Sequence, residues 1–144
     1  MTAAVRRVPT TTAMAAAPAH RPRFVLPPPP PPVVKLDPNG CNTFNMLSPG
    51  ASDRVSDNYN IYRDRIKEKK FKSAYPLWKD VYTNAPKTNG RIDYVFRDGI
   101  KIYDAFIEAT TDEALKSRYV DTMMTIYEKA VVCFPNKKSY YLSK

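Results

Sequence analysis

Side chains that commonly carry out catalysis are few in this sequence. Its single histidine, His20, lies among alanines and prolines near the N-terminus. The chain has no glycine-rich phosphate loop, no nucleophile elbow and no histidine pair spaced to bind zinc. The adjacent Asp112 and Glu113 match a helix start, where negative charge favours the dipole, and Asp121 and Glu128 match polar helix faces. We therefore expect no catalytic residues, no metal and no other cofactor.

The two cysteines are far apart in the chain. Cys41 and Cys133 are separated by 92 residues, and neither has a histidine or a second cysteine nearby. A zinc site needs about four ligands, usually in closely spaced pairs, so this pattern argues against zinc. A disulfide between the two is one possibility, but the interpretation that we favour is two unpaired thiols. The cellular compartment is therefore left open.

Basic and aromatic residues recur together along two of the helices expected below. Such a combination suits the binding of acidic protein segments, because it joins charge to apolar contact area. If the two helices lie side by side, the residues form a basic groove edged by tyrosines. The predicted groove residues are Tyr59, Arg63 and Lys67 on the first helix and Tyr94, Arg97 and Lys101 on the third. The alternative is that Tyr59 and Tyr94 simply belong to the core.

Two further stretches mix lysines with aromatic residues. Residues 69–72 read KKFK and residues 137–141 read KKSYY. Charge on the backbone plus stacking on bases is how single-stranded nucleic acids are bound. Both stretches, however, lie at expected helix ends, where cations also favour the helix dipole. We therefore expect a protein or peptide partner of acidic character. The alternative is that the chain is a basic, RNA-binding helical protein.

Composition divides the chain into a tail and a folded part. Residues 1–36 hold nine of the fourteen prolines and five basic residues but no acidic one, and residues 27–32 are an uninterrupted hexaproline. Such a segment cannot bury enough apolar surface to fold, so we predict a disordered, proline-rich basic tail whose hexaproline is an extended spacer. The tail supplies +5 of the net charge of +9. All ten tyrosines and Trp78 follow it.

Localisation cannot be assigned from this tail. Residues 11–17 are too short and too weakly apolar for a convincing secretory signal, although the acid-free tail is similar to an organelle transit peptide. No stretch approaches the roughly 18 consecutive apolar residues of a membrane helix. We expect a soluble chain without a membrane span, with organelle targeting or association with the cell envelope as alternatives.

Apolar spacing predicts an all-α fold after a linker at residues 37–54. Four main helices are expected in a domain over residues 55–144: from a cap at Ser56 or Asp57 to 69, from a cap at Ser73 to 84, over 91–109, and from a cap at Thr111 to 134. Pro76 then falls in the first turn of the second helix, where a missing amide hydrogen costs little. Gly99 in the third helix predicts close approach by another helix.

A repeat links the second and fourth helices. Four positions recur at one offset of 49 residues: Ala74, Trp78, Val81 and Pro86 correspond to Met123, Tyr127, Ala130 and Pro135. A small residue, an aromatic, a small residue and a helix-ending proline at this spacing are typical of the second helix of a tetratricopeptide repeat, whose usual period is about 34 residues. The pattern predicts antiparallel helix pairs stacked as a solenoid. A generic four-helix bundle is the alternative.

Three stretches carry a resemblance to a known family. They resemble segments of a tetratricopeptide family abundant in Bacteroidota, and they follow one another in the same order as in that family: residues 74–86, 98–103 and 119–128. The resemblance covers about residues 58–140. It implies a multi-repeat, exported or envelope-associated protein, of which this chain is an N-terminal fragment or a short relative. Taken together, we expect a non-catalytic scaffold that binds a peptide or partner helix in a groove.

Overall fold

The computed structural model describes residue 27 and residues 35–143. The chain divides into two units, Met1–Pro31 and Pro32–Lys144. The predicted disordered tail at 1–36 lies outside the described residues except at positions 27, 35 and 36. Among the described residues of the second unit the regular elements are all helices, and the one β-bridge, Thr43 with Thr88, is isolated, which confirms the all-α prediction. They are α1 (Pro49–Lys67), α2 (Phe71–Asn84), α3 (Tyr94–Ala109), α4 (Glu113–Cys133) and α5 (Lys138–Leu142), with short 3-10 turns at Phe44–Met46 and Pro135–Lys137.

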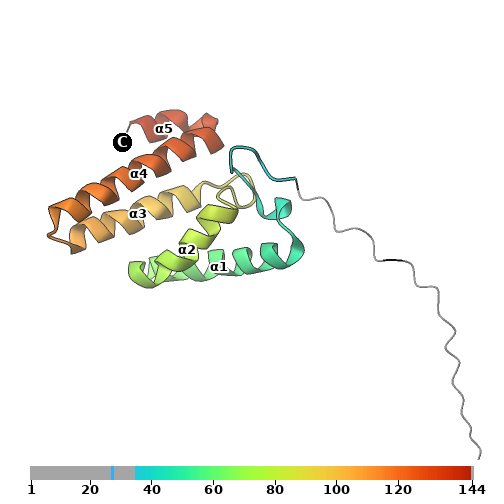
Figure 1. Ribbon diagram of the computed structural model, residues 1–144, viewed down its shortest axis with the longest axis horizontal. Helices are drawn as coiled ribbons and strands as arrows, with labels where there is room; N and C mark the ends of the chain where they lie inside the picture. Colours follow the sequence, from blue (N-terminus) through green and yellow to red (C-terminus); the bar gives the residue numbers. More distant parts are fainter. Residues whose placement is uncertain (1–26, 28–34, 144) are drawn as a thin grey trace, which may run out of the picture. The chain divides into compact units, whose positions relative to one another are not determined.

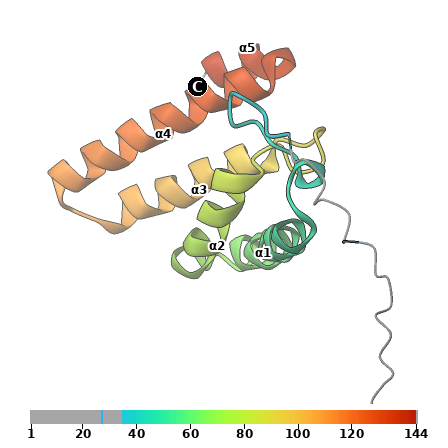
Figure 2. The ribbon, with the colours of Figure 1, turned by 45° about the vertical axis from the view of Figure 1, so that its right-hand side comes forward.

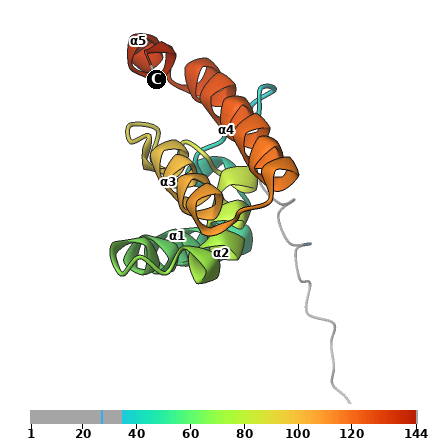
Figure 3. The same ribbon diagram turned by 90° about the vertical axis from the view of Figure 1, so that its left-hand side faces the viewer.

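The helices pack in chain order. Each of α1 to α4 contacts the helix that follows it, and α3 also touches α1. Helices α1 and α2 lie at one end of the stack and α4 and α5 at the other, with α3 between them (Figures 1 and 2). Figure 3 shows α1, α3 and α5 toward one side of the stack and α2 and α4 toward the other.

Helix α1 begins earlier than its apolar spacing predicts. It starts at Pro49 rather than after Ser56, so half of the predicted 37–54 linker is structured as its first turns or as the turn before it. Pro49 suits the first helical position, because the amide hydrogen that it lacks would have no partner there. Val55, completely buried, fixes this segment against the core.

The other helix ends also shift from their predicted positions. Helix α2 begins at Phe71, so Pro76 lies in its second turn and removes the bond that the Lys72 carbonyl would accept. Helix α3 begins at Tyr94, three residues later than predicted. At α4 the cap is Asp112 rather than Thr111: its carboxylate accepts from the amides of Ala114 and Leu115 at 3.0 and 3.2 Å.

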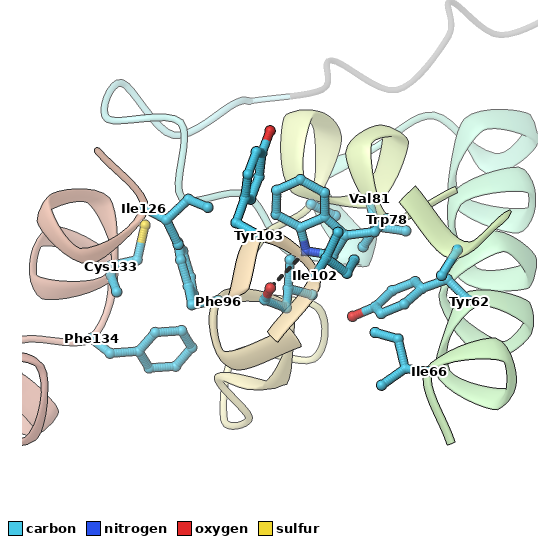
Figure 4. Packing of buried hydrophobic residues seen from close by; sticks show 14 of the residues in the cluster. Tyr62, Ile66, Trp78, Val81, Phe96, Ile102, Tyr103, Ile126, Cys133 and Phe134 are labelled. Atoms are coloured by element: carbon cyan, nitrogen blue, oxygen red, sulfur yellow. Dashed lines mark hydrogen bonds between the residues drawn. The ribbon is translucent and has the colours of Figure 1, made fainter. Parts of the chain in front are cut away.

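Trp78 occupies the centre of the core. Side chains of α1 lie on one side of it and those of α4 on the other (Figure 4). Its Nε1 donates to the carbonyl of Val95 at 2.7 Å, and its ring stacks on Tyr82 with centroids 4.9 Å apart. A β-carbon at Gly99 would lie 2.8 Å from Cε2 of this ring. The close approach predicted from Gly99 is therefore confirmed, and the group that approaches is the indole.

The two copies of the repeat signature are buried to different extents. All four members of the first copy are buried, namely Ala74, Trp78, Val81 and Pro86. In the second copy only Ala130 is buried, while Met123 and Tyr127 are half-buried and Pro135 is exposed. The second copy lies toward the α5 end of the stack, where fewer described residues pack against it.

The two cysteines form a disulfide, so the expectation of unpaired thiols is wrong. Cys41 in the segment before α1 is bonded to Cys133 at the last residue of α4, with Cα atoms 5.4 Å apart. Asp37 shapes the cysteine-bearing loop, because its carboxylate accepts from the amides of Asn39 and Cys41. Only the tertiary fold brings these distant positions together, and no local motif indicates it.

Candidate functional site

Arginine and tyrosine side chains alternate across the face formed by α1, α3 and α5. The guanidinium of Arg63 lies 4.3 Å from the ring centroid of Tyr94, and that of Arg97 lies 4.6 Å from the centroid of Tyr140. Both distances fall within the range of cation–π contacts. We call this set the Arg–Tyr ladder; its members are Tyr59, Arg63, Tyr94, Arg97 and Tyr140.

Asp98, a buried carboxylate, holds Arg63 in place. It is 1% exposed and accepts from Nη1 of Arg63 at 2.8 and 2.7 Å and from the hydroxyl of Tyr62 at 3.0 Å. Burial raises the pKa of this carboxyl above its ordinary value, although the hydrogen bond and charge of Arg63 oppose the shift. Burial together with the neighbouring Asp98 raises the pKa of Tyr62 well above its ordinary value. Asp98 thereby fixes the α1 end of the ladder.

Asp93, a second buried carboxylate, holds Arg97 in place. It is 1% exposed and accepts from Nε of Arg97 at 3.0 Å and from the hydroxyl of Tyr141 at 2.6 Å, while Nζ of Lys137 lies 3.1 Å away. Burial acts to raise the pKa of Asp93, but hydrogen bonds from Tyr141, Lys137 and Arg97 outweigh it and hold that pKa below its ordinary value. Three elements thus meet at one carboxylate.

The structure brings four of the six predicted groove residues into the ladder. Tyr94 is 40% exposed, whereas Tyr59 is half-buried with its ring edge-on to Phe44 and Tyr62, so the core interpretation is partly right for Tyr59. Burial raises the pKa of the Tyr59 hydroxyl, and Arg63 lowers it. The groove prediction did not include the two buried aspartates. For the Asp93–Arg97 ion pair the sequence carries one signal, the four-residue spacing that places two side chains on the same face of a helix.

Lysines of the predicted groove lie at different places. Lys101 is exposed and lines a hollow of about 300 Å³ between α3, α4 and α5. The other residues lining this hollow are Arg97, Ile100, Asp104, Tyr127 and Tyr140. Lys67 is exposed at the end of α1, 3.9 Å from Asp64. Lys101 therefore extends the ladder, whereas no described contact joins Lys67 to it.

The two lysine-rich stretches also separate in structure. Residues 69–72 line a shallow hollow of about 430 Å³ together with Phe106. Lys70 there is 2.8 Å from Glu68. In the stretch 137–141, by contrast, Lys137 is held by Asp93 and Tyr141 is 2% exposed. The first stretch thus gathers its basic and aromatic side chains around one hollow, whereas the second is partly buried against Asp93.

Metal sites and membrane-spanning helices are both absent from the described part of the chain. Within residues 35–143, no group of three or more histidine, cysteine or acidic side chains is placed to hold a metal ion. No helix among those residues has both the length and the apolar character needed to cross a membrane.

The chain was compared with models of protein families, with curated proteins and with solved structures. None of the three comparisons gave a match. The all-helical architecture, the disulfide and the carboxylate-anchored ladder are therefore what the molecule itself offers for inferring its function.

Proposed function

We propose that the chain is a non-catalytic protein-interaction scaffold of tetratricopeptide type, which binds a peptide or partner helix along the Arg–Tyr ladder. The observation that carries this proposal is the anchoring of both ladder arginines by buried carboxylates. Arg63 and Arg97 are 25% and 39% exposed, so each guanidinium is held from beneath and still reaches solvent. Side chains that are already ordered lose little entropy when a partner binds.

Charge along the ladder favours an acidic segment near the α3–α5 end. Arg63 faces the single carboxylate of Asp98, so these two charges balance. Asp93 faces both Arg97 and Lys137, which leaves one positive charge in excess. Lys101 adds another in the adjoining hollow, where Asp104 is the acidic member. We expect a carboxylate of the partner to lie beside Arg97 and Lys101.

The tetratricopeptide assignment rests on two supports. One is the repeat at an offset of 49 residues between α2 and α4. The other is the alternation of first and second helices across the stack, which gives α1, α3 and α5 a shared face (Figure 3). In solenoid repeats such a shared face is the usual binding surface.

The disulfide supports an oxidising compartment for this scaffold. Disulfides persist in secreted, periplasmic and lumenal proteins and are rare where thiols are kept reduced. The Cys41–Cys133 bond is thus in keeping with an exported or envelope-associated protein.

Peptide capture by the full 144-residue chain tests the scaffold function. An array of short peptides graded in net charge should show preferential binding of acidic ones. Lys101→Glu and Tyr94→Ala should each weaken binding about tenfold, because they remove charge and ring contact at exposed positions. Lys79→Glu, an equal charge change on the exposed part of α2, is the matched control. Equal weakening by the control, or no charge preference, would contradict the proposal.

Arg63→Glu and Arg97→Glu are unsuitable for that test. Each would leave a buried carboxylate facing a second negative charge, and the fold itself would be damaged. Loss of binding would then say nothing about the ladder as a surface. The exposed Tyr94 and Lys101 avoid this problem.

Nucleic-acid binding is the second candidate, favoured by the hollow at residues 69–73. Lys69, Lys70 and Lys72 surround it, with Phe71 and Phe106 supplying aromatic surface. A nucleic-acid binder should hold single-stranded RNA with an affinity that falls steeply as salt rises. Lys72→Glu should then abolish binding while Lys101→Glu leaves it intact. Weak binding that survives Lys72→Glu would exclude this surface.

A further inference from the structure

An apolar groove lies between α4 and α5, next to the α5 end of the ladder, and shares Tyr127 with the hollow that Lys101 lines. Its volume is about 480 Å³, and its lining residues are Met124, Tyr127, Glu128, Val131, Tyr141 and Leu142. Met124 is 52% and Leu142 67% exposed, and Val120, one turn before Met124, is 46% exposed. Val120, Met124, Tyr127 and Val131 follow helical spacing, so they form one stripe along α4. Exposed apolar stripes of this kind mark interaction sites.

The repeat shows what normally covers this stripe. At the offset of 49 residues, Met124, Tyr127 and Val131 correspond to Tyr75, Trp78 and Tyr82 of α2. Helix α3 covers those three positions with aromatic rings. The centroid distances are 5.6 Å for Tyr75–Phe106, 6.0 Å for Tyr75–Tyr103, 6.0 Å for Trp78–Tyr103 and 5.8 Å for Tyr82–Phe96. The α2 stripe is therefore closed by one amphipathic helix.

Helix α5 covers only part of the corresponding stripe on α4. Tyr141 packs edge-on against Tyr127 with ring centroids 6.1 Å apart. Met124 and Val120 lie one and two turns further along α4 and remain open to solvent in the described part of the chain.

Charge on the groove indicates the character of its occupant. Glu128 lines the groove, and Asp121 lies two turns earlier on the same side of α4. Both side chains are exposed, and the lining contains no lysine or arginine. A second copy of the chain would place its own acidic groove edge against the acidic edge of the first copy. The two copies would also repel each other, because each carries a net charge of +9. A helix with a basic flank fits better.

We propose that the α4–α5 groove binds an amphipathic helix of a partner protein. The helix has aromatic or aliphatic residues three, four and seven positions apart and lysine or arginine beside them. It packs on Met124, Tyr127 and Val131 as α3 packs on Tyr75, Trp78 and Tyr82. This inference rests on the scaffold function proposed above but uses a different surface, with a partner of opposite charge.

A synthetic helix tests the proposal directly. The probe has the sequence of α3, with its apolar residues retained and lysine in place of Asp98, Asp104 and Glu108. A fluorescent label reports binding to the full chain by anisotropy, and a peptide of the same composition in scrambled order is the reference. We expect saturable binding of the probe and at least about tenfold weaker binding of the scrambled peptide.

Two single substitutions locate the binding site. Met124→Asp should weaken binding of the probe at least about tenfold, because the bound helix would bury a carboxylate in the middle of the apolar contact. Val132→Asp is the matched control: Val132 is 53% exposed on the same helix, against 52% for Met124, but it does not line the groove. Circular dichroism of both variants checks that the fold is kept, as expected for exposed positions.

Several outcomes would overturn the proposal. They are equal affinity for probe and scrambled peptide, equal weakening by Val132→Asp and Met124→Asp, and self-association of the chain that Met124→Asp abolishes. The last result would assign the groove to a second copy. Tyr94→Ala should leave probe binding unchanged, because Tyr94 lines neither the groove nor the hollow that shares Tyr127 with it. Failure of the groove and failure of the ladder are therefore observed separately.

Discussion

Arg63 and Asp98 show how one ion pair serves both the fold and the surface. Asp98 is 1% exposed, and the only guanidinium that reaches it in the described structure is that of Arg63. Burying such a carboxylate is unfavourable unless the charge is paired and hydrogen-bonded. The ladder arginine is therefore a structural requirement as well as a candidate contact for a partner.

Removing Arg63 should expose this dependence. Arg63→Ala should lower the free energy of unfolding by about 3 kcal/mol, the lower end for a broken buried pair, because Arg63 is partly exposed. Urea denaturation at neutral pH measures the change. Asp98→Asn in the same chain should recover part of the loss. Arg54→Ala is the control, since its pair with Asp80 is 56% exposed on the arginine side and should contribute under about 1 kcal/mol. Equal losses for Arg54 and Arg63 would contradict this account.

Asp93 predicts a pH dependence of opposite sign to that of Asp98. The pKa of Asp93 is held below its ordinary value in the folded state by Tyr141, Lys137 and Arg97 acting against burial. Its stabilising effect is thus fully present above the unfolded pKa, about 3.9 for aspartate, and is lost as pH falls through the lower folded value. The raised pKa of Asp98 works the other way.

The Asp93→Asn variant separates the pH dependence due to Asp93 from that due to Asp98. It should be less stable than the parent chain at pH 7, and the difference should shrink as pH falls below about 3.9. Thermal unfolding followed by circular dichroism across this pH range provides the measurement. A difference that stays constant with pH would show that the charge of Asp93 is not what stabilises the three-element contact.

At the scale of helices, the contact between Gly99 and Trp78 decides whether Gly99→Ala raises or lowers the free energy of unfolding. Glycine inside a helix usually costs about 1 kcal/mol relative to alanine, so Gly→Ala should stabilise. At Gly99 the added methyl would meet the indole of Trp78, with Cε2 2.8 Å away. Gly99→Ala should therefore destabilise by about 1–3 kcal/mol, the range for overpacked cores. Gly50→Ala, where nothing lies within 4 Å, is the control. A Gly99→Ala variant more stable than its parent would place Trp78 elsewhere.

Periodicity predicts the helices, whereas contacts across the fold decide the rest. The apolar spacing of α3 and α4 is long and regular enough to locate both helices. The start of α1 was missed because Ser48, Pro49 and Gly50 match a turn as well as they match a capping serine and a first-position proline. No local spacing indicates the Tyr141–Asp93 bond, which spans 48 residues, and none decides between a disulfide and two free thiols for the cysteines, which are 92 residues apart. Helical spacing therefore predicts four of the five ladder residues, but not Tyr140, and not the Asp98 carboxylate, which lies 35 residues from the Arg63 that it holds.

For the whole molecule, the disulfide closes most of the described chain into a loop. It joins positions 92 residues apart, and a loop of that size is expected to stabilise by about 4 kcal/mol through the entropy of the unfolded chain. Cys41→Ser with Cys133→Ser should lower the free energy of unfolding by about that amount. Reductant should destabilise the parent chain similarly and leave the double variant unchanged. Coincident unfolding curves for oxidised and reduced parent chain would contradict a formed bond.

Limited proteolysis should show which part of the molecule this bond secures. Apolar spacing alone places the start of a resistant core between Ser48 and Asp57, because nothing before that point predicts a packed element. The structure moves it earlier. Asn42 accepts from the amide of Lys87 at 3.1 Å, Phe44 donates to the carbonyl of Thr88 at 2.8 Å, and the disulfide ties the same segment to α4.

Oxidised chain should therefore yield a resistant fragment beginning near Asp37, as read by mass spectrometry. In the reduced chain two backbone bonds to residues 87 and 88 and the ring contact of Phe44 with Tyr59 hold residues 41–44 to the rest of the fold, and cleavage should move toward Ser48. Cleavage within residues 41–47 at the same rate in both forms would mean that the disulfide does not hold this segment. If the shift occurs, the segment before α1 is part of the folded scaffold only where the environment is oxidising, which links the compartment proposed for this protein to the extent of its core.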